Sequence, residues 1–182
     1  MPPDDKSAVA KTAHTAGPSA RYPRTGIGYD SHRFAAGGPI ILGGISIPSD
    51  VHLAGHSDGD AIAHALTDAI LGACGESDIG TLFPDTDSAN AGRDSIEMLR
   101  IAVSRAADHG FVVGNADVTV IAEKPKLSPH RDAIVAILGR TIGGHVNVKA
   151  KTNEGMGWIG RGEGLACIAV ATLYPREGAI RA

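Results

Sequence analysis

Two histidines and an aspartate are the side chains of this sequence best suited to hold a metal ion. Asp30 and His32 lie two positions apart in the strand-like segment Gly26–Phe34, so both should point to the same side. His64 lies in a helix-like segment, away from its apolar stripe. Three such ligands leave one tetrahedral position open, as in catalytic zinc sites, and imidazole favours zinc over magnesium. Alternatively, Asp30 is a surface aspartate beside an ordinary hydrogen-bonded histidine.

The start of the helix-like segment offers a second set of polar groups. Ser57 is followed three residues later by Asp60, which is capping-box spacing and predicts Ser57 as the N-cap. The unpaired N–H groups there, with His56 and Ser57 beside them, could bind phosphate. Asp60 and Asp68 lie one turn on either side of His64, so a carboxylate could receive its second ring N–H. The alternative is a simple cap next to a solvated acidic face.

Three loops could also carry function. Glu154 precedes a stretch rich in glycine, 155–163, and offers a hard oxygen ligand suited to magnesium. Such a glycine density lets the backbone approach a ligand closely. The segments Asp78–Gly80 and Phe83–Asp87 are polar and acidic. Each of these loops could equally be a plain surface turn.

Hydrophobic periodicity and turn residues predict the elements that must position these side chains. Helices are expected from the cap Ser57 to the glycines Gly72 and Gly75, from Asp94 to Asp108 with Gly110 as C-cap, and from the pair Ser128-Pro129 to about Arg140. Strands are expected at 26–34, 40–42, 45–47, 111–113, 116–122, 146–151 and 164–173, with the second and third forming a hairpin. The pattern indicates an α+β sandwich with a mixed, mostly antiparallel sheet and helices on one face.

The last expected strand, Gly164–Leu173, is apolar on both faces. The three helices suffice for one face of the sheet, so we expect another subunit to cover the other.

Composition bounds the class of protein. The 182 residues suit one domain, and 43% hydrophobic with 20% charged residues is ordinary for a globular protein. A net charge of −3 argues against nucleic-acid binding, and no apolar run is long enough to span a membrane. Cys74 and Cys167 lie in apolar runs and are expected to be buried thiols in a reducing, cytoplasmic compartment. We expect a disordered tail at 1–23 without the apolar core of a signal peptide, one domain at 24–176, and a short tail at 177–182.

Taken together and in this order, the motifs resemble those of the 2-C-methyl-D-erythritol 2,4-cyclodiphosphate synthases of the non-mevalonate isoprenoid pathway. The match runs from about Arg24 to Tyr174. Each motif is weak alone, whereas the ordered set is highly specific. The set consists of His56-Ser57-Asp58-Gly59-Asp60 with His64, Asp78-Ile79-Gly80, Leu82-Phe83-Pro84-Asp85-Thr86-Asp87, Val146-Asn147-Val148-Lys149-Ala150 and Gly160-Arg161-Gly162-Glu163-Gly164.

The resemblance implies a site and an assembly. It implies zinc on Asp30, His32 and His64, magnesium or manganese at Glu154 with the substrate phosphates, and transition-state stabilisation by His56 and Thr152. It also implies a homotrimer with active sites between subunits, and a loop at 122–128 that reads cytosine largely through its backbone. The residues implied to contact substrate are Asp30, Ser31, His32, His56, Ser57, Asp78, Ile79, Gly80, Phe83, Pro84, Asp85, Thr86, Asp87, Ala122, Glu123, Lys124, Pro125, Lys126, Leu127, Ser128, Lys151, Thr152, Asn153, Glu154, Trp158 and Arg161.

The implied reaction is a cyclisation. The 2-phosphate of 4-diphosphocytidyl-2-C-methyl-D-erythritol 2-phosphate attacks the β-phosphorus of its own diphosphate and releases CMP. That phosphate is largely ionised at neutral pH, so holding two anions together is the main task. Two alternatives remain: a metal-dependent phosphohydrolase using the same three ligands, and a non-catalytic trimer that binds metal or nucleotide.

Overall fold

A computed structural model describes residues 22–176, and the two predicted tails fall almost wholly outside this range. The elements alternate between short strands, long strands and helices along the chain. In order they are β1 (Arg24–Ala36), β2 (Ile40–Leu42), β3 (Ile45–Ile47), β4 (Val51–Leu53), α1 (Ala61–Cys74), α2 (Ile79–Leu82), the 3-10 turn η2 (Ser88–Asn90), α3 (Ser95–Asp108), β5 (Phe111–Ile121), α4 (Arg131–Ile142), β6 (His145–Lys151), α5 (Gly157–Gly160) and β7 (Gly164–Pro175).

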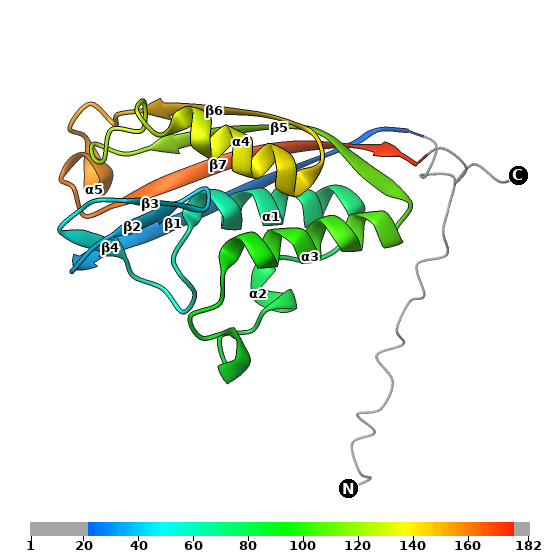
Figure 1. The fold of residues 1–182 in the computed structure, drawn as a ribbon, viewed down its shortest axis with the longest axis horizontal. Helices are drawn as coiled ribbons and strands as arrows, with labels where there is room; N and C mark the ends of the chain where they lie inside the picture. Colours follow the sequence, from blue (N-terminus) through cyan, green and yellow to red (C-terminus); the bar gives the residue numbers. More distant parts are fainter. Residues whose placement is uncertain (1–21, 177–182) are drawn as a thin grey trace, which may run out of the picture.

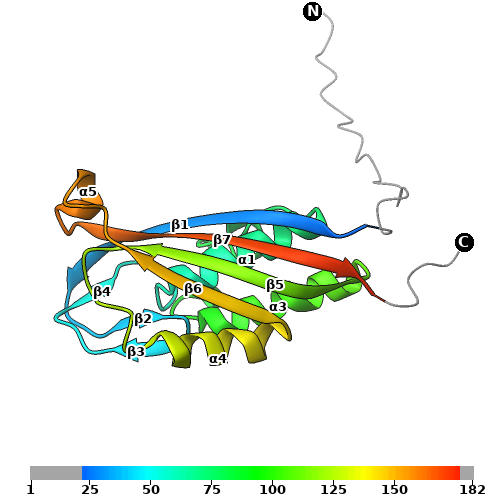
Figure 2. The same ribbon diagram turned by 90° about the horizontal axis from the view of Figure 1, so that it is seen from above.

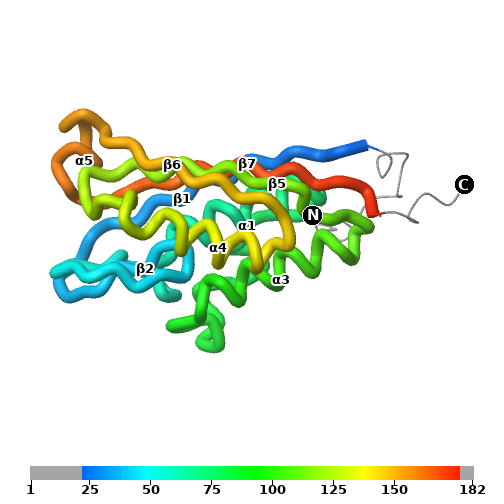
Figure 3. The backbone as a smooth tube through the Cα atoms, turned by 45° about the horizontal axis from the view of Figure 1, so that its top comes forward, coloured from blue at the N-terminus to red at the C-terminus, as the bar shows by residue number. Residues whose placement is uncertain are grey.

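The main sheet has the strand order β4-β1-β7-β5-β6, and every neighbouring pair is antiparallel except β5 and β6. Strands β1 and β7 come from opposite ends of the chain and run side by side (Figure 3). Helices α1, α3 and α4 lie on one side of this sheet (Figure 1). Seen from above, strands β1, β7, β5 and β6 lie side by side with α1 and α3 behind them (Figure 2). The predicted mixed, mostly antiparallel α+β fold is confirmed.

Helix α1 packs against β1 almost backbone to backbone. A methyl group added at Gly28 would lie 2.8 Å from the amide nitrogen of Ala69, and one added at Gly26 would lie 2.6 Å from that of Ala73. Real Cβ atoms essentially never approach so closely. The strand needs glycine at these two positions because the helix needs the space. Alanines such as Ala65 on the facing side of the helix complete this close contact.

The uncovered face of the sheet is apolar and exposed. Ile27 and Tyr29 on β1 are 70% and 56% exposed, and Ile168 and Val170 on β7 are 36% and 37% exposed. These four residues face one another across the two strands, in the pairs Ile27–Val170 and Tyr29–Ile168. The alternate residues of β7, including Cys167, are fully buried beneath the helices. The prediction of an apolar strand with one unprotected face is therefore confirmed.

The structure corrects the start of two helices. Asp60, not Ser57, is the N-cap of α1, and its carboxylate accepts hydrogen bonds from the backbone of Ile62 and Ala63. Helix α4 begins at Arg131 rather than at Ser128-Pro129, because those residues form a preceding turn. In both places the cap-like residues are followed by a turn that delays the helix.

Several strand and helix boundaries also differ. The two segments expected at 111–113 and 116–122 are one strand, β5, with a bulge between Val113 and Asn115. Gly110, expected as the C-cap of α3, follows the actual cap His109 and adopts a left-handed φ of 82°. The short elements β4, α2, η2 and α5 are missing from the sequence-based prediction, because each is too short to show a period.

Two further predictions concern composition. Cys74 and Cys167 are free and buried, as expected. Within residues 22–176, no helix has both the length and the apolar character required to cross a membrane.

Candidate metal centre and active-site cleft

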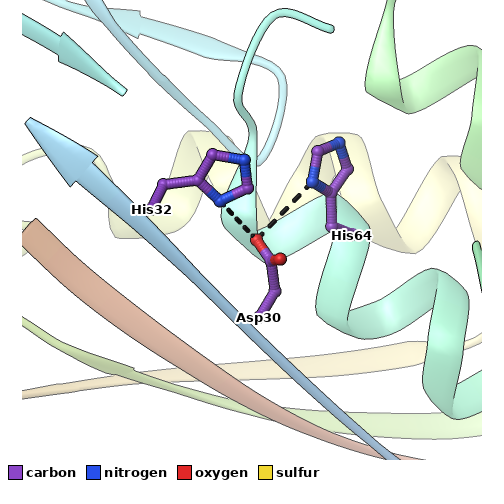
Figure 4. A group of neighbouring side chains, drawn as sticks. All are labelled: Asp30, His32 and His64. Atoms are coloured by element: carbon purple, nitrogen blue, oxygen red, sulfur yellow. Dashed lines mark ion pairs between the residues drawn. The ribbon is translucent and has the colours of Figure 1, made fainter. Parts of the chain in front are cut away.

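Asp30, His32 and His64 converge on one point, as predicted from their spacing (Figure 4). Asp30 and His32 project from the same face of β1, and His64 projects from the first turn of α1. The Oδ2 atom of Asp30 lies 2.7 Å from Nδ1 of His32 and 3.5 Å from Nδ1 of His64. The two imidazole rings are tilted by 46°, with centroids 5.2 Å apart.

These ligand atoms fit a metal ion better than they fit one another. Asp30 Oδ2 and His32 Nδ1 are both buried, yet neither has a hydrogen-bond partner of acceptable geometry. Buried polar atoms without partners are rare and call for an explanation, such as an ion. One carboxylate and two imidazoles form a three-ligand set typical of an open zinc site.

The charges within the cluster also shift the pKa values of Asp30 and His64. Burial alone would raise the pKa of the Asp30 carboxyl, but the imidazoles of His32 and His64 outweigh it and lower that pKa from 3.8 to about 2. Burial would lower the pKa of His64, yet the facing Asp30 carboxylate raises it above the ordinary 6.5. Without metal, the pair therefore favours a carboxylate beside an imidazolium. A divalent cation would take the place of that proton.

The second ring nitrogen of His64 faces hydroxyl groups, not the predicted carboxylates. Its Nε2 lies 2.9 Å from Ser95 Oγ and 3.0 Å from Ser57 Oγ. Asp60 instead caps the helix and binds the amides of Gly43 and Gly44. The predicted alignment of Asp60 with His64 is wrong, because Asp60 stands outside the helix as its cap.

The anion site predicted at the mouth of α1 is also wrong in its physical basis. The carboxylate of Asp60 already occupies the amide groups of Ile62 and Ala63, and Asp60 is completely buried. No free N–H pair of this helix end is therefore left for phosphate. His56 and Ser57 nevertheless lie near the metal cluster, because they line the same cavity as His64.

A cavity of about 120 Å³ joins His64, one member of the cluster, to several of the predicted substrate residues. His64 forms part of its wall, opposite the short helix α2. Asp68 holds that helix in place by accepting a hydrogen bond from the Ile79 amide at 2.7 Å. Asp78 caps the same helix through the Thr81 amide. The predicted residues in the wall are His56, Ser57, Ile79, Gly80, Phe83 and Asp85.

A family model described as the YgbB family matches residues 23–174. The chain belongs to the YgbB family. A curated 2-C-methyl-D-erythritol 2,4-cyclodiphosphate synthase from Gemmatimonas aurantiaca is 62% identical to this chain over 153 residues, which is 82% of this chain and 92% of that protein. The resemblance found in the ordered motifs is thus confirmed.

Solved structures share the fold of this YgbB family member. The structure of IspF from Plasmodium falciparum in complex with CDP aligns with a TM-score of 0.75 and 36% identity, over 85% of this chain and 97% of that one. The bifunctional IspDF from Campylobacter jejuni aligns with a TM-score of 0.82 and 41% identity. That alignment covers 85% of this chain but 42% of the longer bifunctional chain.

Other predicted residues of this YgbB family chain line separate hollows. A cavity of about 780 Å³ brings Glu123, Lys124, Pro125 and Lys126 together with Arg161. One of about 250 Å³ joins Ser31 and His32 to Trp158, and one of about 370 Å³ contains Leu127, Ser128 and Lys151. Within the described chain, the Asp30 cluster and the 122–128 loop therefore open into different hollows.

The loop at 152–155 is held in a fixed shape. Glu123 Oε1 accepts hydrogen bonds from the amides of Asn153 and Gly155, at 3.0 and 3.2 Å. Thr152 donates its hydroxyl to Glu154 Oε1 at 2.7 Å. Glu154 is the one non-glycine residue between 22 and 176 with a positive φ, 52°. Such backbone strain is concentrated at functional sites. Glu154 belongs to no cluster of potential ligands in that range.

Sequence reasoning missed Ser95 and Asp58 as neighbours of the cluster. Ser95 is fully buried at the start of α3, and its hydroxyl makes a short hydrogen bond to Asp58 Oδ1. These contacts span 31 residues to His64 and 37 to Asp58. No local pattern could have indicated them, although Ser95 directly follows the helix cap Asp94.

Proposed function

We propose that this chain converts 4-diphosphocytidyl-2-C-methyl-D-erythritol 2-phosphate to 2-C-methyl-D-erythritol 2,4-cyclodiphosphate and CMP. An oxygen of the 2-phosphate forms a bond to the β-phosphorus, and the bond from that phosphorus to the bridging oxygen breaks. The electron pair leaves with CMP. The convergence of Asp30, His32 and His64 beside a cleft lined by His56 and Ser57 is the observation that carries this proposal.

The names of the relatives support it. The Gemmatimonas aurantiaca relative is a cyclodiphosphate synthase at 62% identity, and the Plasmodium falciparum neighbour is a complex with CDP. CDP is the nucleotide part of the proposed substrate.

Asp30, His32 and His64 would hold zinc through one carboxylate oxygen and two Nδ1 atoms. When bound, zinc would act as a Lewis acid on a phosphoryl oxygen of the substrate. Two aligned phosphates carry several negative charges, so cations and fixed donors are the main requirement of this reaction. The unpartnered buried atoms Asp30 Oδ2 and His32 Nδ1 support this assignment.

Glu154 would hold the second ion, magnesium or manganese, together with the substrate phosphates. Carboxylate oxygens suit these hard cations, which usually keep several non-protein ligands. The isolation of Glu154 from other potential ligands in the described chain agrees with a site that the phosphates must complete. We assign His56 and Thr152 to stabilising the charge that develops in the transition state.

We assign substrate contacts to the residues that line the hollows around the cluster. Asp78 and the α2 residues would contact the methylerythritol phosphate end. The loop 122–128, with Trp158 and Arg161, would contact the CDP end. These two groups open into different hollows within one chain, so a second subunit is needed to bring them to one substrate.

We propose a homotrimer that uses the exposed sheet face. Soluble monomers rarely expose a continuous apolar patch such as the one formed by Ile27, Tyr29, Ile168 and Val170. Ile168→Glu should split the assembly and abolish turnover together, because it buries a charge between subunits. Ser104→Glu is the matched control, since it adds the same charge on the exposed side of α3. Sedimentation giving a fully active monomer, or an intact trimer of Ile168→Glu, would contradict the assembly.

The buried free thiols Cys74 and Cys167 support a cytoplasmic location, where thiols stay reduced.

Product analysis tests the reaction. The purified protein is incubated with the CDP-linked substrate, zinc and magnesium, and CMP, cyclic diphosphate and inorganic phosphate are quantified. We expect equal amounts of CMP and cyclic product without free phosphate. Release of inorganic phosphate would indicate a phosphohydrolase instead, and no turnover would favour a non-catalytic binding protein.

A further inference from the structure

We propose that Ser95 and Asp58 are positioning residues that fix the tautomer and orientation of the His64 ring. The inference rests on the proposed metal site but adds a task for two residues outside the ligand set. Ser95 does not line the cleft beside His64, and it is completely buried. It can therefore act on the reaction only through the groups it touches.

The Ser95 hydroxyl contacts Asp58 Oδ1, His64 Nε2 and, at 3.4 Å, Ser57 Oγ, and its shortest contact decides where its proton goes. Asp58 is a carboxylate and can only accept, so the short contact to its Oδ1 uses the single hydroxyl proton of Ser95. With that proton used, the Ser95 oxygen can only accept from His64 Nε2, which lies 2.9 Å away. His64 consequently carries its proton on Nε2. Its Nδ1, 3.5 Å from Asp30 Oδ2, is then the nitrogen that can give up its proton and offer a lone pair to a metal ion.

Asp58 is itself held firmly in the accepting role. Its Oδ1 accepts the Asp60 amide at 3.2 Å, and its Oδ2 accepts the Ser95 amide at 3.2 Å. Two backbone donors thus orient the carboxylate before the hydroxyl reaches it. The chain from Asp58 through Ser95 to His64 is a carboxylate–hydroxyl–imidazole relay. It differs from the usual carboxylate–histidine pair only by the inserted hydroxyl.

The relay also frees Ser57 for another task. Ser57 Oγ lies 3.0 Å from the same nitrogen of His64, but it faces the cleft. Because Ser95 supplies a buried acceptor for the Nε2 proton, Ser57 can turn its hydroxyl to a ligand in the cleft without changing the His64 tautomer.

Zinc affinity measured by competition with a chelator tests the relay. Ser95→Ala should weaken zinc binding about 10- to 100-fold, the usual effect of losing an outer hydrogen-bond partner of a metal-bound histidine. Asp58→Asn should weaken it in the same direction, and Ser95→Thr, which keeps the hydroxyl, should restore most of the affinity. Ser104→Ala is the matched control, because Ser104 is an exposed serine of the same helix. Cobalt-substituted Ser95→Ala should also show an altered visible spectrum, which a loss of stability alone would not produce.

A measurement on the wild-type chain keeps the inference testable if Ser95→Ala does not fold. Nitrogen NMR of the metal-free protein, titrated until the His64 ring has lost one of its two protons, should show the remaining proton on Nε2. A proton on Nδ1, or unchanged zinc affinity in folded Ser95→Ala, would overturn the relay. Wild-type protein that binds no zinc would overturn the proposed metal site instead, while the tautomer measurement would still decide on the relay.

Discussion

The close contact between β1 and α1 predicts a large effect for the smallest possible substitution, Gly28→Ala. The added methyl group would lie 2.8 Å from the Ala69 amide nitrogen and closer still to the Ala65 carbonyl oxygen. Both obstacles are backbone atoms, so no side chain can turn away. The strand and helix would have to separate by about 1 Å. Overpacking of this kind typically costs about 1–3 kcal/mol, and we expect about 3 kcal/mol here.

The same separation would disturb the metal cluster. Asp30 lies on the strand just beyond Gly28, and His64 lies on the helix next to Ala65. Metal–ligand distances tolerate deviations of only about 0.2 Å, so a shift of about 1 Å between the two elements should cost most of the bound zinc. The loss should exceed what the reduced stability explains.

Two measurements separate these effects. Denaturant unfolding in the presence of a chelator measures the loss of stability, and metal analysis of the folded protein measures the loss of zinc. Gly72→Ala is the control, because it changes glycine to alanine on the same helix where no atom lies within 4 Å. It should stabilise the protein by about 0.5–1 kcal/mol and leave zinc unchanged. Wild-type stability and a full zinc equivalent in Gly28→Ala would refute the idea that this contact sets the ligand spacing.

Three further perturbations separate the roles of the site residues. His64→Ala should lose bound zinc and nearly all turnover while the protein stays folded; one zinc per chain in metal analysis would exclude His64 as a ligand. Glu154→Gln should retain zinc but need much more magnesium or manganese for activity, so an unchanged metal-activation curve would return Glu154 to a surface role. In metal-free protein, the lowered pKa of Asp30 should add about 2 kcal/mol of stability above pH 3.8, lost as the pH falls toward 2. The raised pKa of His64 should add stability that is fully present below pH 6.5 and is lost as the pH rises through the pKa of His64 in the folded protein. Unfolding curves measured at several pH values should show both the loss of stability at low pH and the loss at higher pH, and Asp30→Asn is the control.

The sequence predicted the parts of the site that follow from local periodicity. Asp30 and His32 share a face because strand side chains repeat every two residues. His64 was recognisable because it stands off the stripe of Ile62 and Leu66, although nearly all of α1 is buried. Patterns of this kind depend only on residues that are close in the sequence, so they can be recognised before any tertiary contact is known.

The errors arose where distant contacts override local signals. Ser57 and Asp60 have capping-box spacing, yet Gly59 takes a left-handed φ of 73° and the helix starts after it. Asp60 is drawn to the amides of Gly43 and Gly44, which lie 17 and 16 residues away. The partners of His64 at Ser95 and Asp58 depend on how α3 packs against α1, which no local window of sequence contains.

The buried carboxylate of Asp60 also determines how this region opens. It accepts from four amides, two at the tip of the β2–β3 hairpin and two in the first turn of α1. Neither segment can unfold alone without leaving a buried charge short of half its donors. The amide hydrogens of Gly43, Gly44, Ile62 and Ala63 should therefore exchange with solvent at similar rates, as one cooperative unit. His64 lies one turn further along this helix, so the fluctuation that releases the hairpin tip is also the one that loosens a metal ligand.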